Sequence, residues 1–156
     1  MRRVSKILTS GQPQAVDPGT SSNSQNLLKS RAEAALGPFE NAVREAPEAP
    51  SYHARLGLVY AHLGRNADAL REGSQAVNLL PVSTDAFEGP GYVTNLAEIF
   101  CILGEYEKAI DRLDYLLSMP AGRYVSVPSL QKDPRWDALR DHPKFKRILD
   151  KYAKGL

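Results

Sequence analysis

The chain has 156 residues, of which 42% are hydrophobic and 24% are charged, and this composition is typical of one globular domain with an apolar core. A net charge of only +2 and the lack of any run of about 18 apolar residues exclude a strongly basic nucleic-acid binder and a membrane-spanning protein. The single cysteine, Cys101, excludes an internal disulfide and a zinc site made of cysteines, and it fits a reducing compartment, so we expect a cytoplasmic protein.

Residues 1–25 are predicted to form a flexible N-terminal tail, because their later part consists mainly of Ser, Gly, Pro, Gln and Asn and has almost nothing to bury. Apolar residues at helical spacing begin at Leu27 and continue to Val43. Pro38 interrupts this pattern. A proline there would break or kink one long helix, and it fits best as the first residue of a new helix.

Four amphipathic helices of roughly 13 residues, joined by very short turns, are predicted between residues 50 and 120. The first and third end at Gly64 and Gly104, and the second and fourth end before Pro81 and Pro120. No alternating pattern of useful length indicates a strand. The sequence therefore predicts an all-α fold.

The two helix pairs match one another at an offset of 40 residues. The matching positions are Leu56 and Leu96, Gly57 and Ala97, Tyr60 and Phe100, Gly64 and Gly104, and Ala69 and Ala109. A further half copy lies 34 residues upstream of the second helix, where Ala42 and Pro47 match Ala76 and Pro81. These matches divide residues 26–123 into a partial repeat at 26–48 and full repeats at 50–83 and 90–123.

A helix-turn-helix period of 34 residues with this arrangement of small and large residues resembles the tetratricopeptide repeat. The residues that carry the resemblance are Leu56, Gly57, Tyr60, Ala69, Ala76 and Pro81. The resemblance implies a short α-solenoid in which Gly57 and Ala69 lie where the two helices of one repeat cross. The sequence departs from the repeat at His53 and Val93, which stand in place of a tryptophan, and at Gly73, which stands in place of a large residue.

Residues 50–150 are also similar to the C-terminal part of many bacterial tetratricopeptide proteins. The six inserted residues around 83–91 and the closing segment 133–148 carry this similarity. In that group the repeats follow a eukaryotic-like Ser/Thr kinase domain or a winged-helix DNA-binding domain. The similarity implies either a stand-alone scaffold or a vestigial or regulatory part of a split bacterial kinase or transcription regulator.

Residues 124–156 are predicted to form a C-terminal helical cap, because a solenoid leaves the apolar face of its last repeat open. The segments 133–134 and 141–143 each place an aspartate before a proline, as helix starts do. Trp136 and Leu139 then fall on one apolar side. The second cap helix has Phe145, Ile148, Leu149 and Tyr152 at helical spacing. We therefore expect Trp136 to pack in the core and not to stack on bases.

Motifs of catalysis are absent from the sequence. It has no glycine-rich phosphate loop, kinase motif or nucleophile elbow, and His53, His62 and His142 have no helical partner suited to a metal. We therefore expect no enzyme activity, no cofactor and no metal. Cys101 lies in the middle of a helix and is expected to be a buried small hydrophobe.

The first helices of successive tetratricopeptide repeats line a concave face that binds partners. The residues expected on that face are Ser51, Ala54, Leu58, Ala61, His62, Thr94, Asn95, Glu98 and Ile102. Ala54 and Leu58 take the places where carboxylate-clamping members have Lys and Asn, so no such clamp is expected. The expected function is a non-catalytic interaction module for a protein or peptide partner, with a neutral to acidic groove that suits an apolar or basic segment. The alternative is that this face packs against residues 24–36 or against another copy in a homodimer.

Charge is distributed unevenly along the chain: the net charge is +4 over residues 1–31, −7 over 32–122 and +5 over 123–156. The basic, aromatic C-terminal segment raises a weaker alternative, a nucleic-acid-associated protein. Four interleaved aspartates dilute its positive field, namely Asp133, Asp137, Asp141 and Asp150. Nucleic-acid binding is therefore not expected.

Overall fold

The computed structural model describes residues 18–120 and 124–154, and within these ranges every regular element is a helix. The predicted all-α class is confirmed. In chain order the elements are α1 (Pro18–Glu45), α2 (Pro50–His62), α3 (Asn66–Leu79), α4 (Gly89–Ile102), α5 (Tyr106–Leu117), α6 (Val127–Lys132), the 3₁₀ helix η1 (Pro134–Leu139) and α7 (Pro143–Ala153).

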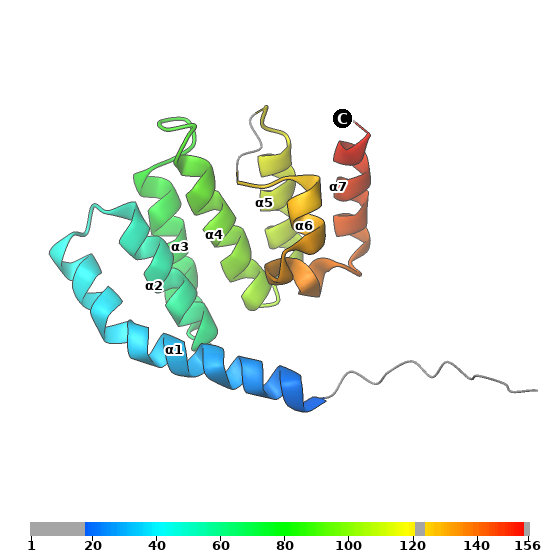
Figure 1. Cartoon of the computed structure of the whole chain (residues 1–156). Helices are drawn as coiled ribbons and strands as arrows, with labels where there is room; N and C mark the ends of the chain where they lie inside the picture. Colours follow the sequence, from blue (N-terminus) through cyan, green and yellow to red (C-terminus); the bar gives the residue numbers. More distant parts are fainter. Residues whose placement is uncertain (1–17, 121–123, 155–156) are drawn as a thin grey trace, which may run out of the picture.

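Helices α2 to α5 stand side by side, and α1 runs across their lower ends in the view of Figure 1. The most extensive contacts join α2 with α3 and α4 with α5, the two helix pairs that the sequence predicts. The first helices of the two pairs, α2 and α4, also pack on each other. The C-terminal elements lie against α4 and α5 at the far end of the row (Figure 1).

The two helix pairs turn in the same way, because a glycine with positive φ ends the first helix of each. The φ angles are +73° at Gly64 and +78° at Gly104, in the left-handed region where other residues carry a steric cost. The N–H of Arg65 donates to the carbonyl of Tyr60 at 2.9 Å, and the equivalent bond after Gly104 also measures 2.9 Å. This pattern closes the helix end and reverses the chain within a few residues.

The aligned positions of the two pairs are also equivalent in their packing. All of the following are buried: Leu56 and Leu96, Gly57 and Ala97, Tyr60 and Phe100, and Ala69 and Ala109. A Cβ atom on Gly57 would lie 3.0 Å from the backbone nitrogen of Gly73 and 3.2 Å from the carbonyl oxygen of Ala69. Gly57 therefore lies at the crossing of α2 and α3, where the sequence predicts it.

The predicted break at Pro38 is wrong, because α1 continues through this residue. Proline removes the hydrogen bond to the carbonyl of Ala34. Ala34, Gly37 and Pro38 are all exposed, so water can reach that carbonyl. Leu36, Phe39 and Val43 pack the second half of α1 against the cluster around Leu56 and Tyr60. The helix consequently bends instead of ending, as Figure 1 shows.

The N-terminal boundary also differs from the prediction, which places a flexible tail through residue 25. Residues 18–25 belong to α1. Extending an existing helix by one residue costs far less free energy than nucleating a new helix. A helix that forms at the apolar residues after Leu27 can therefore extend backwards through the polar residues that precede them. The predicted tail at residues 1–17 lies outside the described residues.

The C-terminal segment contains one more helix than predicted, α6, which begins with a reciprocal capping box between Ser126 and Ser129. Asp133 caps η1, accepting the N–H of Arg135 at 3.0 Å. The predicted cap at Asp141 is wrong: the N-cap of α7 is His142, whose Nδ1 accepts the N–H of Lys144.

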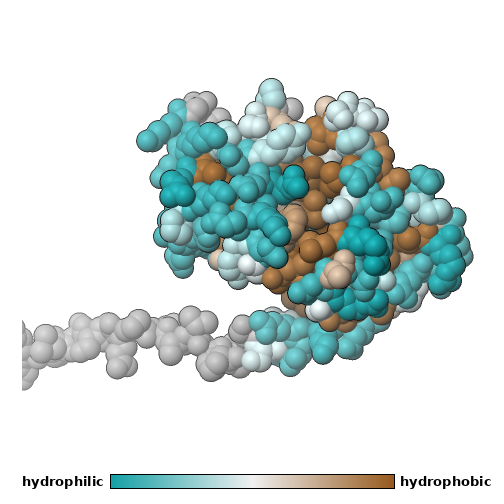
Figure 2. Space-filling view, turned by 180° about the vertical axis from the view of Figure 1, so that it is seen from behind, coloured by the Kyte–Doolittle hydropathy of each residue, from teal (hydrophilic) through white to brown (hydrophobic). Residues whose placement is uncertain are grey.

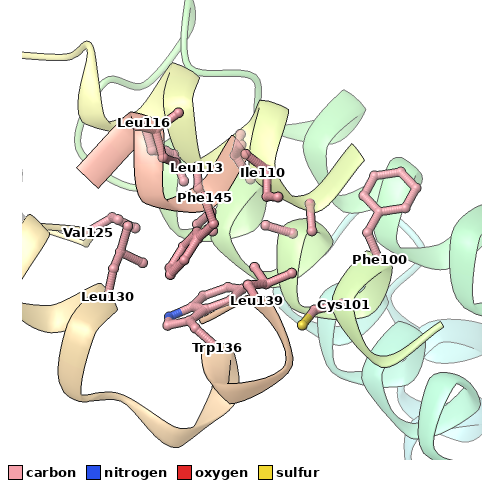
Figure 3. Close-up of a cluster of buried hydrophobic side chains, with 14 of the residues drawn as sticks. Phe100, Cys101, Ile110, Leu113, Leu116, Val125, Leu130, Trp136, Leu139 and Phe145 are labelled. Carbon is pink, nitrogen blue, oxygen red and sulfur yellow. The ribbon is translucent and has the colours of Figure 1, made fainter. Parts of the chain in front are cut away.

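The largest apolar cluster joins this C-terminal segment to α4 and α5 (Figure 3). Trp136 is 1% exposed and Phe145 is fully buried, and Figure 3 shows their rings close together between the C-terminal segment and α5. Trp136 therefore packs in the core, where its spacing places it.

Candidate functional site

An open hollow of about 280 Å³ lies between α2, α4 and the C-terminal segment. We call it the α2–α4 groove. Its lining residues are Ser51, Ala54 and Arg55 of α2, Glu88 before α4, Gly91, Tyr92, Thr94 and Asn95 of α4, and Tyr124 and Arg135 of the C-terminal segment. Three separate parts of the chain thus converge on one concave surface.

Side chains from α2 and α4 give the groove a polar surface. Ser51 and Arg55 are one helical turn apart on α2 and both are exposed. Asn95 is half-buried on the facing helix, and no described residue forms an ion pair or hydrogen bond with the Arg55 side chain. Burial, assisted by Glu88, raises the pKa of the Tyr92 hydroxyl, which therefore remains a hydrogen-bond donor at neutral pH.

Arg135 forms the edge of the groove and fixes the C-terminal segment to α4. Its guanidinium donates to Asp133 Oδ2 at 2.6 Å and to Glu98 Oε2 at 3.2 Å. The hydrogen bonds from the Arg135 side chain and backbone N–H hold the pKa of Asp133 below its ordinary value. The edge of the groove therefore carries both positive and negative charge, and the guanidinium of Arg135 already forms its ion pairs within the molecule.

Four of the nine residues predicted on the concave face lie together in the α2–α4 groove: Ser51, Ala54, Thr94 and Asn95. Ala54 and Thr94 are only 1% and 5% exposed, and the Thr94 hydroxyl donates to the carbonyl of Pro90 at 2.8 Å. These two side chains form the floor of the groove, and the more exposed Ser51 and Asn95 lie beside them.

Three other predicted residues lie at the opposite end of the face, next to α1. Ala61, His62 and Ile102 face residues 25–29 of α1 across a second hollow of about 330 Å³. Ala61 is 4% exposed. The alternative that this face meets residues 24–36 therefore describes its lower end, whereas the upper end at Ser51 stays open.

The last two predicted residues are mainly structural. Leu58 is half-buried and packs on the cluster around Leu56 and Tyr60, and Glu98 pairs with Arg135. The prediction missed Arg55, although its position four residues after Ser51 would have indicated the same face. It also missed the residues supplied by the C-terminal segment, for which the repeat pattern contains no signal.

The predicted neutral to acidic character of the groove is wrong, because both basic and acidic side chains line it. Arg55 and Arg135 face the hollow together with Glu88. This arrangement suits polar ligand groups better than an apolar segment.

His53 and Glu72 form a buried pair outside the groove. The His53 Nδ1 lies 2.7 Å from Glu72 Oε2, and its Nε2 lies 2.8 Å from the carbonyl oxygen of Pro47. Both ring nitrogens are engaged, so neither remains to bind a metal or to exchange a proton with a substrate. His53 thus bridges α2, α3 and the turn after α1.

No nucleophile or metal cluster stands out in the part of the chain that the structure describes. Burial raises the pKa of Cys101 to about 11, which keeps the thiol protonated, and its sulfur lies 3.6 Å from the carbonyl oxygen of Arg135. Across residues 18–120 and 124–154, no three His, Cys, Asp or Glu side chains are arranged to hold a metal ion.

Two basic C-terminal residues, Lys144 and Lys151, pair with acidic residues of α5. Lys144 lies 2.8 Å from Glu107 and 2.6 Å from Asp111, and Lys151 lies 3.1 Å from Asp114. These pairs join part of the positive C-terminal segment to the negative middle of the chain across the α5–α7 contact.

No family model, curated protein or solved structure matches the chain. None of the helices among the described residues combines the length and the apolar character that a membrane crossing requires.

Proposed function

We propose that this chain is a non-catalytic protein–protein interaction module that binds an extended peptide segment of a partner in the α2–α4 groove. The observation that carries the proposal is the convergence of α2, α4 and the C-terminal segment on one open, polar hollow of about 280 Å³. A concave surface built from several rigid elements is the usual form of a binding site.

The equivalence of the two helix pairs supports a short solenoid of tetratricopeptide-like repeats. The same glycine-ended turn, a buried aromatic residue and small residues at the crossing recur at equivalent positions 40 residues apart. In such arrays the first helices of the repeats form the binding face, and here these helices are α2 and α4.

The chemistry of the groove favours a polar partner segment. Ser51 of α2 and Asn95 of α4 offer hydrogen-bonding groups, and Arg55 adds a cation that has no ion pair with a described residue. A peptide backbone in extended form presents N–H and carbonyl groups that such side chains recognise. The proposed partner is a cytoplasmic protein, because a chain whose single cysteine is a buried free thiol suits a reducing compartment.

The experiment is affinity capture from a cell lysate with the full chain and three variants. Arg55→Glu and Asn95→Arg alter the groove, whereas Arg147→Glu makes the same charge change on the exposed side of α7. We expect partners of the wild-type chain and of Arg147→Glu to be depleted about tenfold or more with both groove variants, provided that circular dichroism shows all four chains equally folded. Partners captured equally by the groove variants would contradict the proposal.

A further inference from the structure

A second groove lies on the opposite face, between α3 and α5. Figure 2 views the molecule from behind and shows an apolar band between two hydrophilic surfaces, at the place where α4 lies between α3 and α5. Two adjoining hollows of about 110 Å³ and 240 Å³ follow this band and share Val77, Val93 and Arg112. Their other lining residues are Ser74, Asn78, Pro81, Val82, Ser83, Leu96 and Tyr115.

The connection between the two helix pairs explains why this groove exists. Helices α3 and α5 both pack on α4 and make no extensive contact with each other. The turn after α3 folds back on the start of α4, where a Cβ atom on Gly89 would lie 2.9 Å from the backbone of Val82. Pro81 and Val82 therefore form one end wall of the groove, and the buried Val93 and Leu96 of α4 form its floor.

The groove carries one charge. Arg112 is exposed and lines both hollows, and no acidic side chain lines either of them. Within the described ranges Arg112 has no ion pair or hydrogen bond from its side chain. The nearby acids of α5 point elsewhere: Glu107 and Asp111 pair with Lys144 of α7. A lone guanidinium beside an apolar floor is complementary to an apolar group that carries a carboxylate.

We propose that the groove between α3 and α5 is a second docking site, and that its occupant is a peptide segment with an apolar side chain next to an aspartate or glutamate. The apolar side chain lies on Val77 and Val93, and the carboxylate binds the Arg112 guanidinium. This chemistry differs from that of the α2–α4 groove, and the two grooves lie on different faces. Two partners can therefore bind at once, which makes the chain a bridge between them.

The test uses a displayed library of random peptides, each of about a dozen residues, selected on the full wild-type chain. Enriched peptides are then measured by calorimetry against the wild-type chain and against Arg112→Gln. Lys108→Gln removes a positive charge one helical turn away on α5, and Arg55→Gln removes one from the α2–α4 groove. All three sites are exposed, so the variants are expected to fold.

We expect a set of enriched peptides that pair an apolar residue with Asp or Glu and that bind Arg112→Gln about tenfold more weakly, while both control variants bind as the wild type does. Changing the peptide carboxylate to an amide weakens binding to the wild type similarly and has no further effect on Arg112→Gln. The proposal is overturned if the enriched peptides lack a carboxylate or bind Arg112→Gln unchanged. It is also overturned if the face instead joins two copies, seen as a dimer that Arg112→Gln dissociates in sedimentation.

Discussion

Ile99 of α4 fills the space that Gly73 of α3 leaves open. The Ile99 Cδ1 atom lies 2.6 Å from the position of a Cβ atom built on Gly73, and it lies 2.9 Å from the equivalent position on Gly57. One side chain of the second helix pair thus packs into the crossing of the first pair. Ile99 is fully buried, so the space beside Gly73 is filled by this contact.

Gly73→Ala is expected to lack the gain of about 1 kcal/mol in the free energy of unfolding that replacing a helical glycine with alanine ordinarily brings. A new Cβ atom at 2.6 Å from Ile99 Cδ1 forces side chains or helices to move. Urea denaturation followed by circular dichroism measures the change.

Gln75→Ala is the control, because Gln75 is exposed on the same helix as Gly73. This substitution should change stability by no more than about 0.5 kcal/mol. Ile99→Val removes the clashing Cδ1 atom, so the double variant with Gly73→Ala should be less destabilised than the sum of the two single changes. A Gly73→Ala variant stabilised by the full gain of about 1 kcal/mol would contradict the contact.

Trp136→Ala should destabilise the protein by about 3 kcal/mol, because the indole is 1% exposed in the largest apolar cluster and its removal leaves a cavity. For a chain of this size the loss corresponds to a fall in Tm of roughly 6–12 °C. Tyr115→Ala, which truncates an aromatic that is 46% exposed, should change stability by no more than about 0.5 kcal/mol. An unchanged melting temperature for Trp136→Ala would refute the role of the C-terminal segment as a cap.

Gly64→Ala and Gly104→Ala should destabilise the protein by similar amounts, each about 1 kcal/mol, because both force alanine into the left-handed region. Thermal denaturation of the two variants compares them. A large cost at one turn and none at the other would show that the two helix pairs are not equivalent.

Acid should destabilise the protein through two carboxylates of the C-terminal contact. Hydrogen bonds from Arg135 hold the pKa of Asp133 below 3.8, and those from Lys144 hold the pKa of Glu107 below 4.5. The unfolded chain therefore binds protons first as the pH falls. The contribution of each group is complete above its unfolded pKa and disappears as the pH passes through its folded value. Fluorescence of Trp136 during urea denaturation should show stability falling between about pH 5 and pH 3.

Asp133→Asn should make this decline shallower, since the substituted residue no longer titrates. Asp150→Asn, on the exposed side of α7, is the matched control and should leave the decline unchanged. Identical pH profiles for wild type and Asp133→Asn would mean that the ion pair with Arg135 contributes nothing to stability.

Local patterns predicted the helix pairs well, because their cause is local. The glycine after each first helix and the small residues at each crossing act within one or two turns of chain. Pro38 misled the prediction, since its effect depends on whether water reaches a carbonyl, and exposure is a property of the whole fold. The capping role of His142 in place of Asp141 depends on backbone geometry in the same way.

Only part of the candidate site could be predicted, because the rest depends on contacts between distant parts of the chain. Helical spacing places Ser51 and Asn95 on one face, but it cannot show that Arg135 from a distant segment completes the groove or that α1 covers His62. Such contacts join residues far apart in the sequence, so no periodic pattern carries them.

Photocrosslinking tests the central claim, partner binding in the α2–α4 groove, most directly. A benzophenone amino acid is placed at Ser51 in the groove or at Asp150 on the exposed side of α7, and the chain is irradiated in a cell lysate. We predict a discrete crosslinked partner from position 51, lost when Asn95→Arg is added, and no such product from position 150. No product from position 51, or the same product from both positions, would contradict the claim.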